Sequence, residues 1–184
     1  MGGHHLILGE MDDFITGEAL PDTHDERYRQ KIARFLVLEK GYAKEDVHPR
    51  NPLTVAAGNR RGQLWVDFMV TVDDRTAMVI KYGPGSLVTR YRPTIAISRL
   101  VAPYQVPVVV VTNGESADIL DGETGRLTAS GFDRIPSREA LLQQLARAEF
   151  LPIPLKQVEM EARIVYAFEI DGSCPCDDTA CRIA

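Results

Sequence analysis

The sequence lacks any apolar run long enough to cross a membrane. The longest run, around Val106–Val111, ends after a few residues, whereas a membrane-spanning helix needs about 20. The first ten residues, MGGHHLILGE, contain neither a basic segment nor a long apolar core, so a secretory signal is not expected. We therefore predict a cytoplasmic protein that makes no membrane contact.

Cysteine is scarce and confined to one end of the chain. The three cysteines, Cys174, Cys176 and Cys181, lie within the last eleven residues, which excludes a disulfide framework spread through the fold. Thiolates at this spacing are able to share one Zn²⁺ ion or an iron–sulfur cluster. One of the four histidines would then supply the fourth ligand. A tail with incidental cysteines is the other interpretation.

An excess of positive charge is also lacking. The 21 basic and 26 acidic residues give a net charge of −5, so no strong overall field attracts nucleic acid or an anionic membrane. Contact with nucleic acid therefore requires a local patch. The 184 residues include 45% hydrophobic and 26% charged residues and no internal repeat, a composition typical of a single globular domain.

The first strong helix signal begins at Thr23. The segment Thr23-His24-Asp25-Glu26 is a capping-box pattern, apolar residues at helical spacing follow it, and Gly41 is typical of the residue after a helix end. The residues before Thr23 show no clean periodicity. They predict an irregular arm with a short helix around residues 12–15.

The rest of the chain predicts a mixed α/β fold. Alternating apolar residues and turn signals predict strands over 53–57, 64–72, 77–82 and 106–112, a hairpin over 117–129, and helices over 94–101, 137–148 and 155–168. The element order is therefore α-β-β-β-α-β with further helices at the C-terminal end. A central mixed sheet flanked by helices fits this order.

The same pattern divides the chain into four parts. We predict an N-terminal arm over residues 1–22, the α/β core over 23–130, C-terminal helices over 131–170 and a cysteine-containing tail over 171–184.

The element order, with an aspartate on the second strand and a lysine at the end of the third, resembles the PD-(D/E)XK nuclease superfamily. Residues 26–47, the segment Val66-Asp67-Phe68-Met69-Val70 and the segment Val109–Gly114 are similar to the N-terminal domain of the R subunit of type I restriction enzymes. The resemblance covers residues 25–125. It implies a restriction-endonuclease-like fold and a role on DNA in restriction-modification.

The resemblance also implies a metal-dependent site. Asp67 matches the aspartate that binds Mg²⁺ or Mn²⁺ in such nucleases, Glu26 matches a first-helix glutamate that faces the same site, and Lys81 would steady the phosphate or the attacking water. Carboxylates hold a divalent ion that polarises the phosphate and lowers the pKa of its water. The capping box gives Glu26 a second, purely structural interpretation.

The third strand departs from the nuclease pattern of Glu-x-Lys. If Lys81 takes the glutamate position, Gly83 takes the lysine position; if Lys81 is the lysine, Val79 replaces the glutamate. Neither register supplies a second carboxylate, and an ammonium beside a single carboxylate repels a divalent cation. Asp73-Asp74 is a candidate replacement, although this pair is more typical of a turn. We therefore expect weakened or lost cleavage.

Two further hypotheses compete with a DNA-acting nuclease-like domain. One is a non-catalytic module in which a lysine, a glycine-rich turn and two arginines bind nucleic-acid or nucleotide phosphate; its residues are Lys81, Gly83, Gly85, Ser86, Arg90 and Arg92. A tight turn with solvated arginines explains the same segment.

The other hypothesis is an interaction protein that carries metal or an iron–sulfur cluster on its cysteine tail. A partner protein and a homo-oligomer belong to these expectations.

Overall fold

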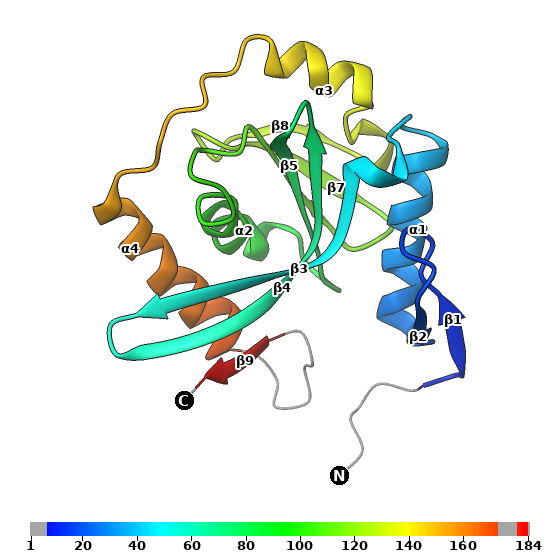
Figure 1. Ribbon diagram of the computed structural model, residues 1–184, viewed down its shortest axis with the longest axis horizontal. Coiled ribbons are helices and arrows are strands. Elements are labelled where there is room, and N and C mark those ends of the chain that lie inside the picture. The colour runs from blue at the N-terminus through cyan, green and yellow to red at the C-terminus, as the bar shows by residue number, and fades with distance from the viewer. Residues whose placement is uncertain (1–6, 173–179, 184) are drawn as a thin grey trace.

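The computed structural model describes residues 7–172 and 180–183 of the chain. A mixed sheet of seven strands lies at the centre with helices around it, and a small two-stranded ribbon stands beside α1 (Figure 1). The helices are α1 (His24–Leu38), α2 (Tyr91–Ser98), α3 (Arg138–Leu145) and α4 (Leu155–Val165), and α4 continues into a π-helical turn, η4 (Tyr166–Ile170). The strands are β1 (Glu10–Asp12), β2 (Ala19–Pro21), β3 (Val47–Ala57), β4 (Arg60–Val72), β5 (Arg75–Tyr82), β6 (Val108–Thr112), β7 (Ala117–Asp121), β8 (Leu127–Ser130) and β9 (Ala180–Ile183). Short 3₁₀ turns are η1 (Lys44–Asp46), η2 (Val88–Arg90) and η3 (Phe132–Arg134).

The sheet confirms the predicted fold class. Its strand order is β3-β4-β5-β6-β7-β8, and β9 pairs separately with β4. The β5–β6 pair is parallel and is connected through α2, whereas the other pairs are antiparallel. This crossover is expected, because two parallel strands cannot be joined by a tight hairpin.

Alternating residues of the central strands face two different sets of helices. On β5, Met78 and Ile80 belong to a core that includes Leu36 of α1 and Leu141 of α3. Val79 belongs to a second core, with residues of α2, α4 and η4. Since successive strand residues point to opposite faces, α1 and α3 cover one face of the sheet and α2 and α4 cover the other.

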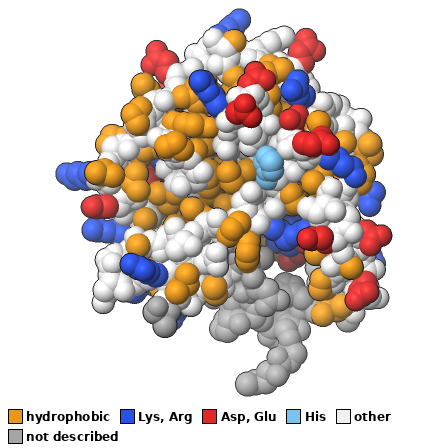
Figure 2. Space-filling model, viewed as in Figure 1, with side chains coloured by type: hydrophobic (Ala, Val, Ile, Leu, Met, Phe, Trp, Pro, Cys, Tyr) orange, Lys and Arg blue, Asp and Glu red, His pale blue; other side chains and the backbone are white. Residues whose placement is uncertain are grey.

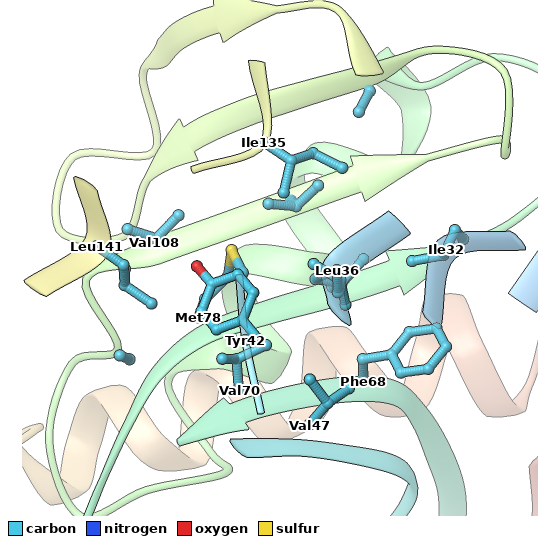
Figure 3. Packing of buried hydrophobic residues seen from close by; sticks show 14 of the residues in the cluster. Ile32, Leu36, Tyr42, Val47, Phe68, Val70, Met78, Val108, Ile135 and Leu141 are labelled. Carbon is cyan, nitrogen blue, oxygen red and sulfur yellow. The ribbon is translucent and has the colours of Figure 1, made fainter. Parts of the chain in front are cut away.

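Figure 3 shows the first core. Leu36 and Ile32 of α1 point toward Phe68, Val70 and Met78 on the sheet, and Tyr42 packs among them. Ile135, Val108 and Leu141 extend the packing toward α3. All of these side chains are buried. The predicted amphipathic face of α1 is therefore the face that joins the helix to the sheet.

The ends of α1 follow the predicted signals. The Thr23 side chain accepts a hydrogen bond from the Glu26 backbone N–H at 3.1 Å. Gly41 has a φ of +75°, a left-handed conformation that glycine adopts without a Cβ clash. The predicted helix is confirmed, and Thr23 is its N-cap. Its C-cap is Glu39, so Gly41 lies one residue beyond the C′ position that the pattern predicts.

The N-terminal arm corrects one prediction. The short helix expected around residues 12–15 is wrong, because β1 ends at Asp12 and a turn follows. The Asp13 carboxylate accepts the backbone N–H groups of Ile15 and Thr16, both at 2.8 Å. A side chain that binds the backbone ahead of it favours a turn over a helix.

A fully buried glutamate joins the two helices on the second face. Glu161 of α4 has no exposed surface and pairs with Arg99 just after α2 and with Arg92 on α2, each at 2.6 Å. Arg99 also donates to the Gln105 side chain at 2.9 Å. The pairs hold α4 against α2.

We predict that Glu161→Ala destabilises the protein by about 3–5 kcal/mol, because it leaves the largely buried Arg99 without its carboxylate. Urea unfolding followed by circular dichroism measures the change. Glu159→Ala, on the exposed side of the same helix, is the control and should change the free energy of unfolding by less than about 0.5 kcal/mol. Equal losses in the two variants would contradict the predicted role of the ion pairs.

Candidate functional site

A fork in the sheet positions the candidate site. The first half of β4 pairs with β9 over Arg61–Leu64, and its second half pairs with β5 over Phe68–Val72. The residues between, Trp65 to Asp67, therefore lie where β4 changes its neighbour on that side. Backbone groups at such a point lose their ladder partners and require others, since buried backbone groups are almost always hydrogen-bonded.

Asp67 and Lys81 fill this fork. The Lys81 ammonium lies 3.0 Å from Asp67 Oδ2 and donates to the Trp65 carbonyl oxygen at 3.3 Å. The Tyr82 backbone N–H donates to the same Asp67 oxygen at 3.0 Å. Both side chains are buried, with 3% of Asp67 and 6% of Lys81 exposed. The two residues that the nuclease resemblance singles out are thus brought together, and each satisfies a backbone group of the fork.

Arg29 of α1 holds the other oxygen of Asp67. Its Nε lies 2.7 Å from Asp67 Oδ1, and its guanidinium lies over the Tyr82 ring at 5.2 Å. Burial by itself raises the pKa of the Asp67 carboxyl, but the charges of Lys81 and Arg29 outweigh burial and hold that pKa below its usual range. Asp67 is therefore an ionised carboxylate with a cation on each oxygen.

The pair extends into a row of alternating charges. Glu26 Oε2 lies 3.7 Å from Arg29, and Glu26 Oε1 lies 3.2 Å from Arg50 of β3. Arg50 reaches Asp13 of the N-terminal arm at 2.5 Å. At the other end, Glu169 of η4 lies 4.0 Å from the Lys81 ammonium. The row contains four acids and three bases, and it joins the arm, α1, three strands and the C-terminal helix.

Glu26 makes contacts that the sequence did not predict. Its carboxylate accepts from the Gln30 side chain at 2.8 Å as well as from Arg50. The Thr23 backbone N–H, which a capping box would assign to Glu26, donates to the Pro21 carbonyl oxygen at 3.0 Å. Glu26 faces the site, as the resemblance implies, but Arg29 stands between it and Asp67.

The donor set at Asp67 does not fit a Mg²⁺ or Mn²⁺ ion. Such ions take several oxygen ligands, whereas both Asp67 oxygens contact cationic nitrogens. No group of three His, Cys, Asp or Glu side chains lies in metal-binding proximity within the described residues. Asp73 and Asp74 form the turn between β4 and β5 with φ values of 51° and 59°. They supply no second carboxylate to Asp67.

The candidate phosphate-binding residues are not all in one place. The Arg90 guanidinium lies against Gly83, where a Cβ would stand 2.3 Å from its Cζ, and donates to the Pro84 carbonyl at 3.1 Å. Arg92 instead pairs with Glu161. Lys81 is buried against Asp67, while Gly85 and Ser86 are exposed in the loop before η2.

The cysteine tail is described only in part. Cys174 and Cys176 lie outside the described residues, and Cys181 is an exposed free thiol on β9. The pairing of β9 with β4 was not anticipated from the sequence, because no local pattern distinguishes this segment from a loop.

Sequence reasoning missed Arg29, Arg50 and Glu169. A signal existed for Arg29, since it follows Glu26 by three residues and so lies on the same side of the helix. Arg50 and Glu169 had none, because 24 and 88 residues separate them from their partners Glu26 and Lys81.

We predict that Asp67→Asn destabilises the protein at pH 7 by about 3 kcal/mol, because Arg29 and Lys81 lose their common carboxylate. The pKa of Asp67 is lower in the folded than in the unfolded state, so its contribution is complete above pH 3.8 and is lost as the pH falls through the folded value. Urea unfolding at several pH values should show the wild-type and variant curves converging in acid. A difference that is constant with pH would contradict the assignment.

No helix among the described residues is long and apolar enough to span a membrane. Neither the curated proteins nor the solved structures include a significant match to this chain. The family of the type I restriction enzyme R protein N terminus (HSDR_N) matches residues 24–136, from the start of α1 through β8 to the turn before α3. This match includes Asp67, Lys81, Arg29 and Glu26. The chain therefore belongs to the type I restriction enzyme R protein N-terminal family.

Proposed function

We propose that this domain contacts DNA as part of a restriction function but does not cleave it. The observation that carries the proposal is the pairing of both Asp67 oxygens with Arg29 and Lys81. In a metal-dependent nuclease these oxygens would bind the ion that polarises the phosphate. Here each oxygen contacts a cationic side chain of the fold, which supports a structural ion cluster in place of a metal site.

Electrostatics opposes metal entry at this position. A divalent ion at Asp67 would have to displace a cation that is already 2.7 or 3.0 Å from the carboxylate. The displaced group would then remain buried beside the ion with only a more distant carboxylate, Glu26 for Arg29 at 3.7 Å or Glu169 for Lys81 at 4.0 Å. This is costly because like charges repel strongly in a poorly solvated site.

The support for DNA contact is the family membership. The charge distribution on the face in Figure 2 adds no support for DNA contact. Acidic and basic side chains are mixed there, and hydrophobic side chains gather over its left and central parts. Phosphate binding by Lys81 is disfavoured by burial, since 6% of the residue is exposed. A DNA-contacting surface therefore has to use other basic residues.

Metal binding by the cysteine tail is a hypothesis separate from the proposal for Asp67. Zn²⁺ or an iron–sulfur cluster held by Cys174, Cys176 and Cys181 stays a prediction, as do a partner protein and a homo-oligomer. Metal analysis of the purified protein beside a variant with all three cysteines changed to serine tests the first of these.

We expect no cleavage when the protein is incubated with end-labelled single- and double-stranded DNA in Mn²⁺ or Mg²⁺. Intact DNA on a denaturing gel, for both the wild type and Asp67→Ala, is the predicted result. DNA cut by the wild type and left intact by Asp67→Ala would overturn the proposal and establish a working metal centre at Asp67.

A second measurement tests why cleavage is absent. In the double variant Arg29→Gln, Lys81→Glu, one cation is removed from Asp67 and the other is replaced by a carboxylate, so Mn²⁺ should bind and raise the thermal unfolding temperature. At a hundredfold excess over the dissociation constant, binding contributes about 2.7 kcal/mol. The wild type should show no such rise. A rise in the wild type that Asp67→Ala abolishes would show that Arg29 and Lys81 do not block the ion.

A further inference from the structure

Four cations near the outer side of α1 contact aromatic rings, and the three lysines among them also donate to backbone carbonyl oxygens. Together with the three phenylalanines that they contact they form what is here termed the aromatic–basic surface: Lys31, Arg34, Lys40, Lys44, Phe14, Phe35 and Phe132. In Figure 1 this part of the molecule lies at α1, beside the β1–β2 ribbon. It adjoins one end of the row of charges, because the Phe14 backbone N–H donates to the Gln30 side chain, which itself donates to Glu26 and Asp13.

Lys31 and Lys40 flank a pair of contacting rings. Phe35 and Phe132 have their ring centroids 4.5 Å apart. The Lys31 ammonium lies 5.2 Å from the centre of Phe132 and donates to the Gly114 carbonyl at 2.7 Å. The Lys40 ammonium lies 5.1 Å from the centre of Phe35 and donates to a backbone carbonyl.

Arg34 and Lys44 share the ring of Phe14. Arg34 lies 5.0 Å and Lys44 4.3 Å from its centre. Within residues 7–172 and 180–183, none of the four cations forms an ion pair with a carboxylate. Carbonyls and ring faces orient a cation without cancelling its charge. These four cations therefore keep unpaired positive charge at this surface, on a chain whose net charge is −5.

A groove of about 330 Å³ runs along this surface. Arg27, Lys31 and Arg34 line it at spacings of four and three residues, so they share one side of α1. Phe35, Phe132 and the 70% exposed Leu38 add apolar surface. Arg27 is paired with Asp22, and Glu39 is the one acidic side chain among the described residues of the lining.

We propose that this groove binds a short stretch of single-stranded nucleic acid. Lys31 and Arg34 would pair with successive phosphates, and a base would stack on Phe132 once Lys31 turns from the ring to a phosphate. Cationic side chains along a groove with aromatic rings between them are the combination that single-strand binding uses. The inference rests on the proposed DNA contact and identifies the strand form and the residues involved.

The apolar part of the groove favours a single strand over the alternatives. In a duplex the bases are stacked on each other and cannot reach Phe132, so phosphate contacts alone would remain. An acidic peptide would satisfy the cations but would bring no flat ring system to the phenylalanines. A single strand uses both features, because every base has a face that stacks.

Fluorescence anisotropy with a fluorescein-labelled oligo(dT) of about twelve nucleotides tests the proposal on the full chain. Lys31→Glu with Arg34→Glu should weaken binding strongly and reduce the slope of log affinity against log salt by about 1.4, since each single-strand phosphate contact contributes about 0.7. Arg147→Glu with Arg163→Glu makes the same change in net charge at exposed sites elsewhere and is the matched control. It should leave the slope as it is in the wild type.

Phe132→Leu separates stacking from charge. It keeps an apolar side chain at a partly buried position but removes the ring, so binding should weaken roughly 5- to 150-fold with an unchanged salt slope. Thermal unfolding of each variant shows whether the fold is intact.

Three outcomes overturn the inference. Equal loss in the matched control would show that only net charge matters, and the proposed DNA contact would then stand without this site. Tighter binding of a labelled poly-glutamate peptide than of oligo(dT), with the same dependence on Lys31 and Arg34, would assign the groove to an acidic protein partner. Absence of binding to both oligo(dT) and duplex DNA would reject the proposed function as well.

Discussion

The ion pair between Asp67 and Lys81 closes the point at which β4 leaves β9 and joins β5. A sheet that divides in this way exposes backbone groups, and here the Tyr82 N–H and the Trp65 carbonyl are satisfied by the two side chains. Arg29 adds α1 to the same carboxylate, and Glu169 brings η4 close to the lysine. The position of helices on both faces of the sheet is therefore coupled to one buried carboxylate.

This constraint bears directly on function. A catalytic carboxylate in a nuclease needs oxygens that are free to bind a metal ion, whereas a structural carboxylate needs them paired. The oxygens of Asp67 are paired: each contacts a cation, and one also accepts a backbone N–H. The residues that the resemblance singles out lie together, but their charges are paired with one another. The cations on the outer side of α1 contact aromatic rings instead of carboxylates.

The candidate site was only partly predictable. Asp67, Lys81 and Glu26 were identified from residue types at matching positions, and the structure brings all three into one row of charges. The groups that decide its chemistry, Arg29 and Arg50, were not identified, because an arginine on a helix or strand is usually exposed and its sequence context is ordinary. The phosphate-binding set was grouped by closeness in sequence, whereas Arg92 turns to Glu161, 69 residues later along the chain. Nothing local to Arg92 indicates that partner.

The sequence by itself determined the local elements. The Thr23 cap, Gly41, the alternating residues of β4 and the turn residues after it specify α1 and the first hairpin, because these signals act over a few residues. It also determined that no second carboxylate accompanies Lys81 on the third strand. Only the tertiary structure decided which groups the Asp67 carboxylate contacts. Its partners come from α1 and β5, and the docking of β9 and η4 completes the fork. Contacts between distant segments depend on how whole elements pack, and local sequence patterns contain no record of that packing.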